Sequence, residues 1–276
     1  MKKILLAAVL VAGTAMPAMA QDASWTGGYV GGRIGYAFQP NNGDETIVFD
    51  RNLDGTFGDT ISTAAAPTGN AFSPGFCGGA ATSTAPGTGC TKDKDGLDIA
   101  VHAGFDYQFE GGFVVGLVAD YGTQKGRDSV AAFSTTPAFY TMTRRLRDNY
   151  SIRARAGFGT DQFLVYGTGG WAWGKVKNSF STSNTANSFT TNGNDTADGY
   201  RLGVGTEYRL GTNVTVGVQY LYTRLDDDGY RVRAGNTGTT PATNPFLLGN
   251  AAGTDFARSE DKLTSNSLAA TVNFRF

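Results

Sequence analysis

The feature that most limits the fold of this chain is a two-residue alternation between apolar side chains and polar or small ones. In the segment 97–109 every second residue is apolar or aromatic, and the residues between them include Asp98, His102 and Asp106. A period of two places each class of side chain on its own face of a β-strand. The same alternation returns directly after the Gly-containing turn at 110–112.

The alternation predicts eight strands, each roughly nine to thirteen residues long, which is enough to cross a bilayer at the usual tilt. The alternation is weaker in 28–38, and 163–173 has aromatic residues at both alternating positions, so the orientation of 163–173 stays open. The predicted strands are 28–38, 97–109, 113–121, 150–158, 163–173, 200–208, 214–222 and 268–276.

The connections between these strands alternate in length. Short turns fall at 110–112, 160–162 and 210–213. Long extracellular loops and tight periplasmic turns are typical of outer-membrane barrels, whereas a soluble β-sandwich has no reason to sort its loops by length. We therefore predict an all-β fold, an eight-stranded antiparallel up-and-down transmembrane β-barrel with four long extracellular loops. The long connections run over about 39–96, 123–147, 175–197 and 224–264.

Aromatic residues gather at both ends of the predicted strands, as in the aromatic girdles of membrane barrels. The periplasmic group is Phe109, Phe113, Phe158, Tyr208, Phe274 and Phe276. The extracellular group is Tyr36, Phe38, Tyr121, Tyr150, Tyr200 and Tyr222.

The N-terminus has the pattern of a secretory signal peptide at 1–20. Lys2 and Lys3 precede the apolar run 4–12, and Ala18 and Ala20 supply the small residues of a cleavage site. The apolar run is too short to span a bilayer as a helix. Cleavage would leave a single barrel domain over 21–276, integral to the outer membrane.

The composition agrees with a secreted barrel: 39 of 276 residues are glycine, 12% are aromatic and 17% are charged. With 23 basic and 24 acidic residues the net charge is −1, which argues against a nucleic-acid partner.

Cys77 and Cys90 lie close together, and an oxidising compartment favours a local disulfide between them. A disulfide that closes so short a loop stabilises the folded state by about 3 kcal/mol at most.

The inward faces of the strands carry both signs of charge. Unpaired charges in so narrow a barrel are costly, so we predict a connected interior network. It is interpreted either as a structural plug or as a gated, narrow conduit in which Glu207 exchanges arginine partners. Its members are Arg33, Asp98, His102, Asp106, Asp120, Arg153, Arg155, Arg201, Glu207 and Arg275.

His102 is the only histidine, and some outer-membrane barrel enzymes that modify lipids use histidine. Acyl transfer also needs a nucleophile beside the imidazole and access for the substrate. Because His102 falls in mid-strand and faces inward, we expect a hydrogen-bonded interior residue, with Asp120 as a candidate partner. No catalytic residues are predicted.

Two further motifs lie in the extracellular connections. Asp50, Asn52 and Asp54 precede a glycine as in a calcium loop, but Ile61 stands where that loop needs Glu, so an Asx turn is the alternative to Ca²⁺ binding. We predict no other cofactor. Arg144, Arg145 and Arg147 precede the fourth strand, where they would face lipopolysaccharide phosphates or form a solvated rim.

The segments 181–195 and 234–243 are rich in Ser, Thr, Asn and Gly, and we interpret them as flexible, solvated surface rather than as a binding groove.

The opening Trp25–Gly32 segment, the Gly169–Gly170 pair and the closing Val272–Phe276 resemble small barrels of the opacity-porin and OmpA-like superfamily. The resemblance covers nearly the whole mature chain. It implies that Phe276 is read by the barrel assembly machinery. Unlike OmpA itself, the sequence continues into no peptidoglycan-binding domain, so we expect no cell-wall tether.

Taken together, these features predict a monomeric outer-membrane protein with a structural and surface-presenting role, in contact with outer-membrane lipid and lipopolysaccharide. The alternatives are a low-conductance porin for small solutes and, from another class, a lipid-modifying enzyme. Fold alone does not decide among them.

Overall fold

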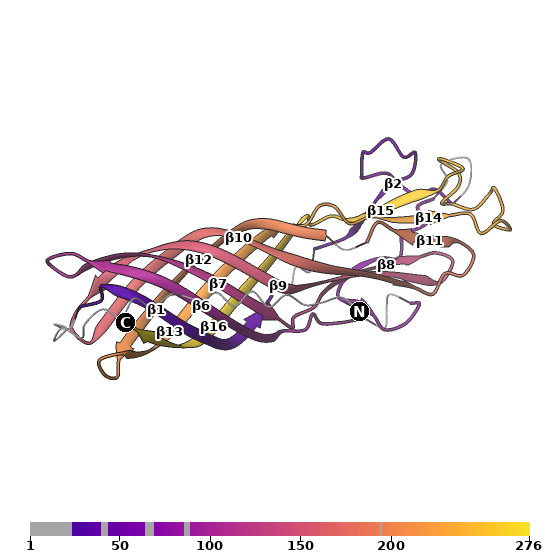
Figure 1. The fold of residues 1–276 in the computed structure, drawn as a ribbon. Coiled ribbons are helices and arrows are strands. Elements are labelled where there is room, and N and C mark those ends of the chain that lie inside the picture. The colour runs from indigo at the N-terminus through magenta and orange to yellow at the C-terminus, as the bar shows by residue number, and fades with distance from the viewer. Residues whose placement is uncertain (1–23, 40–43, 64–68, 86–88, 194) are drawn as a thin grey trace, which may run out of the picture.

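The computed structural model describes residues 24–39, 44–63, 69–85, 89–193 and 195–276. The molecule is elongated, with a barrel at one end and a second group of strands at the other (Figure 1). The predicted signal peptide at 1–20 lies outside the described residues. No helix in the described part of the chain is long and apolar enough to cross a membrane.

The predicted antiparallel barrel of eight strands is confirmed. The ring runs in the order β10, β12, β13, β16, β1, β6, β7, β9, and pairing of β9 with β10 closes it. The barrel strands are β1 (Gly27–Phe38), β6 (Gly96–Gln108), β7 (Phe113–Gln124), β9 (Ala138–Gly159), β10 (Phe163–Thr182), β12 (Asp195–Arg209), β13 (Val214–Asp226) and β16 (Lys262–Arg275).

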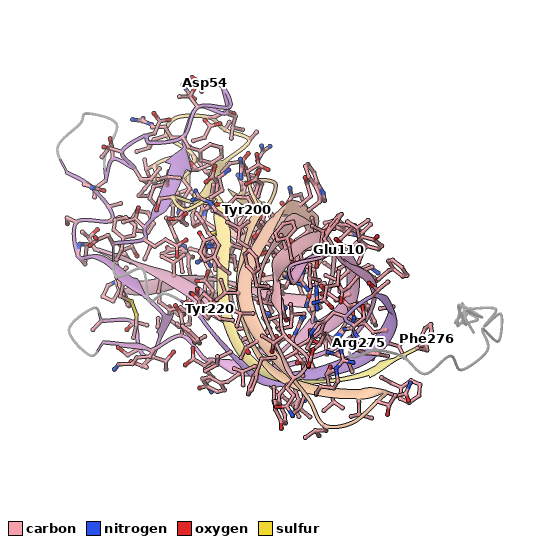
Figure 2. The ribbon with its side chains drawn as sticks, turned by 90° about the vertical axis from the view of Figure 1, so that its left-hand side faces the viewer. Asp54, Glu110, Tyr200, Tyr220, Arg275 and Phe276 are labelled. Atoms are coloured by element: carbon pink, nitrogen blue, oxygen red, sulfur yellow. A yellow bond between two sulfur atoms is a disulfide. The ribbon has the colours of Figure 1, made fainter. Side chains whose placement is uncertain are left out.

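The wall of the barrel has an apolar outer face and a polar inner face, as the alternation predicts. Adjacent residues at the C-terminus illustrate this, because Arg275 lies inside the ring of strands while Phe276 points away from it (Figure 2). The open orientation of β10 is also resolved: Trp171 is 60% exposed on the outside, whereas Leu164 and Tyr166 are buried within.

The turns at the closed end of the barrel are short, as predicted. Gly111 and Gly112 have φ angles of +87° and +88° between β6 and β7. Glycine adopts this left-handed region without steric cost, so the tight turn depends on these two residues.

The aromatic side chains lie on the outer wall in two belts. At the turn end, the ring centroids of Phe113 and Phe158 are 5.5 Å apart. At the opposite end, Tyr150 lies 5.0 Å from Tyr121 and 5.9 Å from the stacked ring of Trp173. The two belts mark the depth at which the barrel crosses the bilayer.

The four long connections on the extracellular side contain more β-structure than the sequence indicated. β9 contains 22 residues and β10 contains 20, so both extend well beyond the aromatic belt. Further strands form on this extension: β8 (Asp128–Ser134) and β3 (Gly75–Gly78) continue the barrel sheet beside β9. The sequence pattern placed the start of the fourth strand at Tyr150. A bulge, seen as a register shift between Gly174 and Val176, breaks the alternation just before that residue.

A second sheet covers this extension (Figure 1). It contains four strands in the order β11, β14, β15, β2, and a separate hairpin pairs β4 with β5. Their bounds are β2 (Ile47–Asp50), β4 (Ala80–Ala81), β5 (Cys90–Thr91), β11 (Ser188–Thr191), β14 (Val232–Gly235) and β15 (Thr254–Arg258). The segments 181–195 and 234–243, interpreted above as flexible surface, instead supply residues to β11 and β14, which pair with each other.

The extension has its own hydrophobic core, which we call the extracellular core. Phe72, Tyr140 and Phe256 lie at its centre, and the rings of Phe72 and Tyr140 are 5.3 Å apart. Three of the predicted loops supply its buried members, and the loop 175–197 packs the partly buried Phe180 and Phe189 against it. Its buried members are Ile47, Phe49, Ile61, Ala71, Phe72, Val130, Ala132, Ala138, Tyr140, Met142, Tyr230, Val232, Ala234, Phe246 and Phe256.

The lipid-facing position of the wall predicts a depth-dependent cost for an added charge. Val204 is 60% exposed midway between the two belts on β12, and Tyr200 lies on the same face in the outer belt. We expect Val204→Arg to destabilise the folded barrel by about 2–4 kcal/mol and Tyr200→Arg by clearly less. Equilibrium urea titrations in lipid vesicles measure both. The reverse ranking would contradict the membrane assignment.

Candidate functional site

The barrel interior contains two layers of ion pairs. In the upper layer, nearer the extracellular side, Asp120 accepts hydrogen bonds from Arg201 at 2.6 Å and Arg153 at 2.9 Å. Arg33 lies 3.7 Å from the same carboxylate and 3.1 Å from Asp98. These side chains are all nearly inaccessible to solvent, so each charge depends on its partners for stabilisation.

The lower layer lies nearer the turns. Arg155 lies 2.8 Å from Glu207 and 2.9 Å from Asp106. Arg275 lies 2.8 Å from Asp106 and 3.7 Å from Glu207, and Arg155 stands over the ring of Tyr29. Two cations and two anions thus alternate in this layer. The structure therefore places all the predicted interior charges inside the barrel and brings them together in two groups.

His102 lies between the layers, but its partner differs from the expected one. Its Nε2 is 2.5 Å from the Oδ1 of Asn273, not hydrogen-bonded to Asp120. Asp120 is the cross-strand neighbour of His102, but its carboxylate oxygens are occupied by arginines and Ser151. A cavity of about 10 Å³ beside His102 is about the size needed for one water molecule.

Apolar side chains close both ends of this polar interior. At the turn end Trp25 is fully buried beside Leu164 and Tyr166, and its Nε1 donates to the carbonyl of Thr160. Gly159 leaves room for the indole, because a Cβ there would collide with it. At the other end an apolar cluster, here called the outer plug, lies inside the mouth. It consists of Leu146, Ala172, Val176, Ala197, Leu225 and Leu263.

These plugs were not predicted from the sequence. Trp25 precedes the first strand, so the alternation assigned it no face. The outer plug interrupts the rule that inward residues are polar, and hydrophobicity alone cannot distinguish an inward Val176 from a lipid-facing one. A sequence signal was present in the strict alternation of Lys175 and Lys177 around Val176.

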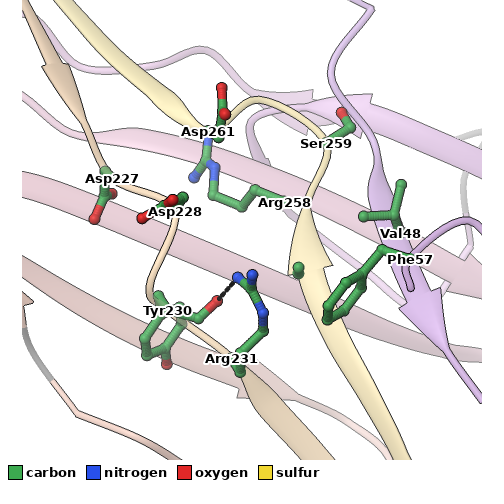
Figure 3. Close-up of a pocket in the computed structure, with 10 residues that line it drawn as sticks. Val48, Phe57, Asp227, Asp228, Tyr230, Arg231, Arg258, Ser259 and Asp261 are labelled. Carbon is green, nitrogen blue, oxygen red and sulfur yellow. Dashed lines mark hydrogen bonds between the residues drawn. The ribbon is translucent and has the colours of Figure 1, made fainter. Parts of the chain in front are cut away.

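A surface pocket lies in the extracellular extension, between β2, β15 and the connection from β13 to β14 (Figure 3). Arg231 covers the ring of Phe57 and donates to the carbonyl of Tyr230. The pocket has a volume of about 360 Å³. Its lining residues are Val48, Phe57, Asp227, Asp228, Tyr230, Arg231, Ala257, Arg258, Ser259 and Asp261.

Arg144 neither faces lipid nor forms part of a solvated rim, the two alternatives drawn from the sequence. Its side chain is buried, lies 2.7 Å from Asp128 and donates to the carbonyls of Glu260 and Lys262. Arg258 joins the same group, 2.6 Å from Asp128. Leu146, two residues after Arg144 on the same strand face, is also directed inward, so Arg145 and Arg147 project to the outside.

The remaining predicted residues lie in the extension and at the seam. The carboxylate of Asp50 accepts backbone N–H bonds from Leu53 at 2.7 Å and Gly55 at 2.8 Å, which is the Asx-turn arrangement. No group of three or more His, Cys, Asp or Glu side chains suited to a metal ion occurs in the described ranges. Calcium binding at Asp50, Asn52 and Asp54 stays a prediction.

Cys77 and Cys90 form a disulfide, as predicted, with Cα atoms 6.3 Å apart. It joins β3 to β5 and so fastens the small hairpin to the barrel sheet. Phe276 is 55% exposed, and its backbone exchanges hydrogen bonds with Gly28 at the seam between the first and last strands.

Half-burial raises the pKa of Asp93 to about 6, although the Ser129 amide donates to its carboxylate; nearby Asp128 raises the pKa further, whereas Arg258 lowers it. A folded-state pKa above the unfolded value of about 3.9 means that the folded protein binds more protons between these pH values. The stability from Asp93 is therefore full below about pH 4 and is lost as the pH rises through about 6.

We expect the unfolding temperature of wild-type protein in micelles to change between pH 7.5 and pH 5 in a way that Asp93→Asn does not reproduce. Relative to the variant, wild type should be more stable at pH 5 than at pH 7.5. Thermal unfolding of both proteins at the two pH values isolates this contribution from those of other groups. Asp228→Asn, an exposed control, should keep the wild-type difference. Identical pH profiles for wild type and Asp93→Asn would refute the assignment.

The upper layer predicts a large effect for Asp120→Asn, because three buried arginines lose their shared counter-charge. We expect a loss of about 3–5 kcal/mol in the free energy of unfolding. Urea unfolding in vesicles measures it, and the exposed Asp228→Asn should change the value by less than about 0.5 kcal/mol. Equal stability of the two variants would show that the network is not needed.

Comparisons with known proteins agree with this architecture. The family model described as outer membrane protein beta-barrel domain matches residues 5–276. The 31 kDa outer-membrane immunogenic protein of Brucella melitensis is 27% identical over 261 residues, which covers 92% of this chain and 84% of the relative. The 22 kDa outer membrane protein of Rhizobium leguminosarum bv. viciae is 29% identical over 174 residues, covering 63% and 74% respectively.

Among solved structures, the outer membrane protein OprG of Pseudomonas aeruginosa aligns with a TM-score of 0.46 and 14% identity. The alignment covers 93% of this chain and 99% of that one.

Proposed function

Since the chain belongs to the family of outer-membrane protein β-barrel domains, we propose that it stabilises the envelope as a closed barrel and presents an ordered β-domain at the cell surface. The observation that carries this proposal is that side chains fill the lumen while the extracellular extension has a hydrophobic core of its own. A porin needs an open path, and a scaffold does not. The protein is an integral outer-membrane protein, in agreement with its relatives.

The filling of the lumen supports the structural role. Two ion-pair layers lie in series between Trp25 at one end and the outer plug at the other. An eight-stranded barrel is only wide enough for side chains to fill it. Solutes would therefore have to displace buried, paired charges, which is costly.

The extracellular core supports the presenting role. Connections without internal packing would be flexible, but here all four are joined by β-pairing and buried aromatic residues. A fixed domain displays the same surface to every partner. The name of the Brucella relative describes an immunogenic outer-membrane protein, which is consistent with surface exposure of this domain.

We further propose that the chain has no catalytic activity. His102 is bonded to Asn273, and the adjoining cavity of about 10 Å³ is too small for a lipid or peptide substrate. A monomer is favoured because β9 and β10 close the ring and leave no barrel edge unpaired for a second copy. The exposed Phe276 at the seam fits recognition by the assembly machinery.

Conductance in planar bilayers tests the closed-barrel proposal. We expect no channel openings from wild-type protein whose insertion is shown by heat-modifiable migration on a gel. Glu207→Gln should also stay silent, because the plugs at both ends remain. Openings in wild type would support the low-conductance porin, and openings only in Glu207→Gln would support a gated conduit.

A further inference from the structure

We propose that one sector of the outer wall binds the phosphate groups of the outer-leaflet lipid. We call it the cationic sector. It lies on the extracellular side of the aromatic belt, over β7, β8, β9 and β10. The proposal rests on the outer-membrane location of the protein and does not depend on the lumen being closed. Its residues are Lys125, Arg127, Arg145, Arg147, Lys175 and Lys177.

The strand alternation directs the four side chains on β9 and β10 outward, and Lys125 and Arg127 are exposed in the connection between β7 and β8. Leu146 and Val176 are cross-strand partners and are buried in the outer plug inside the barrel. Because successive strand residues point to opposite faces, Arg145 and Lys177 must point away from the lumen. Both are accessible to solvent, and Lys175 on the same strand is exposed as well.

The register places three of the cations in one row. Arg145 pairs directly with Lys177 on β10, and Arg144 pairs with Asp128, which sets Arg127 beside Arg145 on the other side. Directly opposed side chains lie about 5 Å apart, and like charges there repel. Partial burial and the charges of Arg127 and Arg147 lower the pKa of Arg145, as expected for crowded cations.

None of the six side chains has an acidic partner within the described residues. By contrast, Lys262 lies 3.0 Å from Asp226 on the opposite side of the barrel, and Arg233 lies 2.6 Å from Asp255 in the second sheet. Asp128 and Asp148 are adjacent in sequence to the sector, but Asp128 pairs with Arg144 and Arg258, and Asp148 accepts a hydrogen bond from Tyr121. The sector therefore retains an excess of positive charge that an external anion can neutralise.

The depth of the sector identifies the anion. Lys175 is two residues beyond Trp173 of the belt, and Lys125 is four beyond Tyr121. At about 3.3 Å per residue and a tilt of about 40°, these two cations lie roughly 5–10 Å above the belt. That is the headgroup layer, where lipid phosphates lie. Arginine forks bind phosphate in a bidentate manner, so the sector suits a phosphorylated lipid such as lipid A.

Energy transfer from tryptophan can measure which lipid surrounds the sector. Two of the three tryptophans, Trp171 and Trp173, lie beside it on β10. The full chain is refolded in phosphatidylcholine vesicles that contain a trace of either fluorescent lipid A or fluorescent phosphatidylcholine. We expect at least about twofold more transfer to lipid A at low salt, falling as salt is added.

The matched variants have the same charge change. Arg145→Gln with Arg147→Gln should abolish the excess transfer, whereas Arg224→Gln with Lys262→Gln, on the opposite wall, should preserve it. Arg145→Lys with Arg147→Lys keeps the charge and should retain most of the excess. Heat-modifiable migration verifies that each variant is folded, and a variant that fails it is replaced by the single Arg145→Gln, for which a reduced excess is expected.

Three results would overturn the proposal. Equal loss in the test and control variants would show that charge anywhere on the wall suffices. Unchanged transfer in Arg145→Gln with Arg147→Gln would show that the sector does not bind lipid. Abolition of the excess by millimolar inorganic phosphate would show a site for free phosphate instead of one for lipid. None of these outcomes depends on whether the lumen conducts.

Discussion

The rest of the structure depends on the pairing of β9 with β10. This ladder is the longest of the eight that form the barrel, whose first and last strands, β1 and β16, are also paired. It then continues past the aromatic belt from Leu146–Val176 to Tyr140–Thr182. A membrane barrel must leave no strand edge unpaired in lipid, and here the same hydrogen-bonded hairpin meets that requirement and serves as the base of the extracellular domain.

Two different kinds of packing follow from that ladder. Below the belt, the inward faces meet across a narrow lumen, where Asp120 and Glu207 each neutralise more than one arginine. Above it, the inward faces are covered by a second sheet and pack around aromatic residues such as Phe256, with the buried ion pairs of Asp128 to Arg144 and Arg258 beside them. The outer plug lies between the ion-paired lumen and the aromatic core of the extension. Ion pairs fill the membrane-spanning part of the barrel, whereas the extension combines an apolar core with a smaller group of buried ion pairs.

The sequence predicted the barrel well because each spanning strand alternates over its whole length, and one residue of slippage would reverse both faces. The same logic assigned every interior charge to its face. It could not predict which interior side chains pair, since partners such as His102 and Asn273 are 171 residues apart. It also missed the extracellular domain, because short strands such as β11 and β14 lie in segments rich in Ser, Thr and Gly, where pairing depends on tertiary contacts and local propensity is weak. Arg144 was misplaced by the bulge that shifts the register on β9 and β10.

Amide hydrogen exchange along β9 and β10 tests most directly whether this ladder is continuous. In refolded protein, residues 138–146 and 176–182 should be protected to a degree comparable with the membrane-spanning 150–158, because the same antiparallel pairing continues through them. Residues 211–213, in the turn between β12 and β13, serve as the rapidly exchanging reference within the same chain. Exchange of 138–146 and 176–182 as fast as that reference would contradict the account, since it would mean that the barrel ends at its aromatic belt and that the extracellular segments are loops.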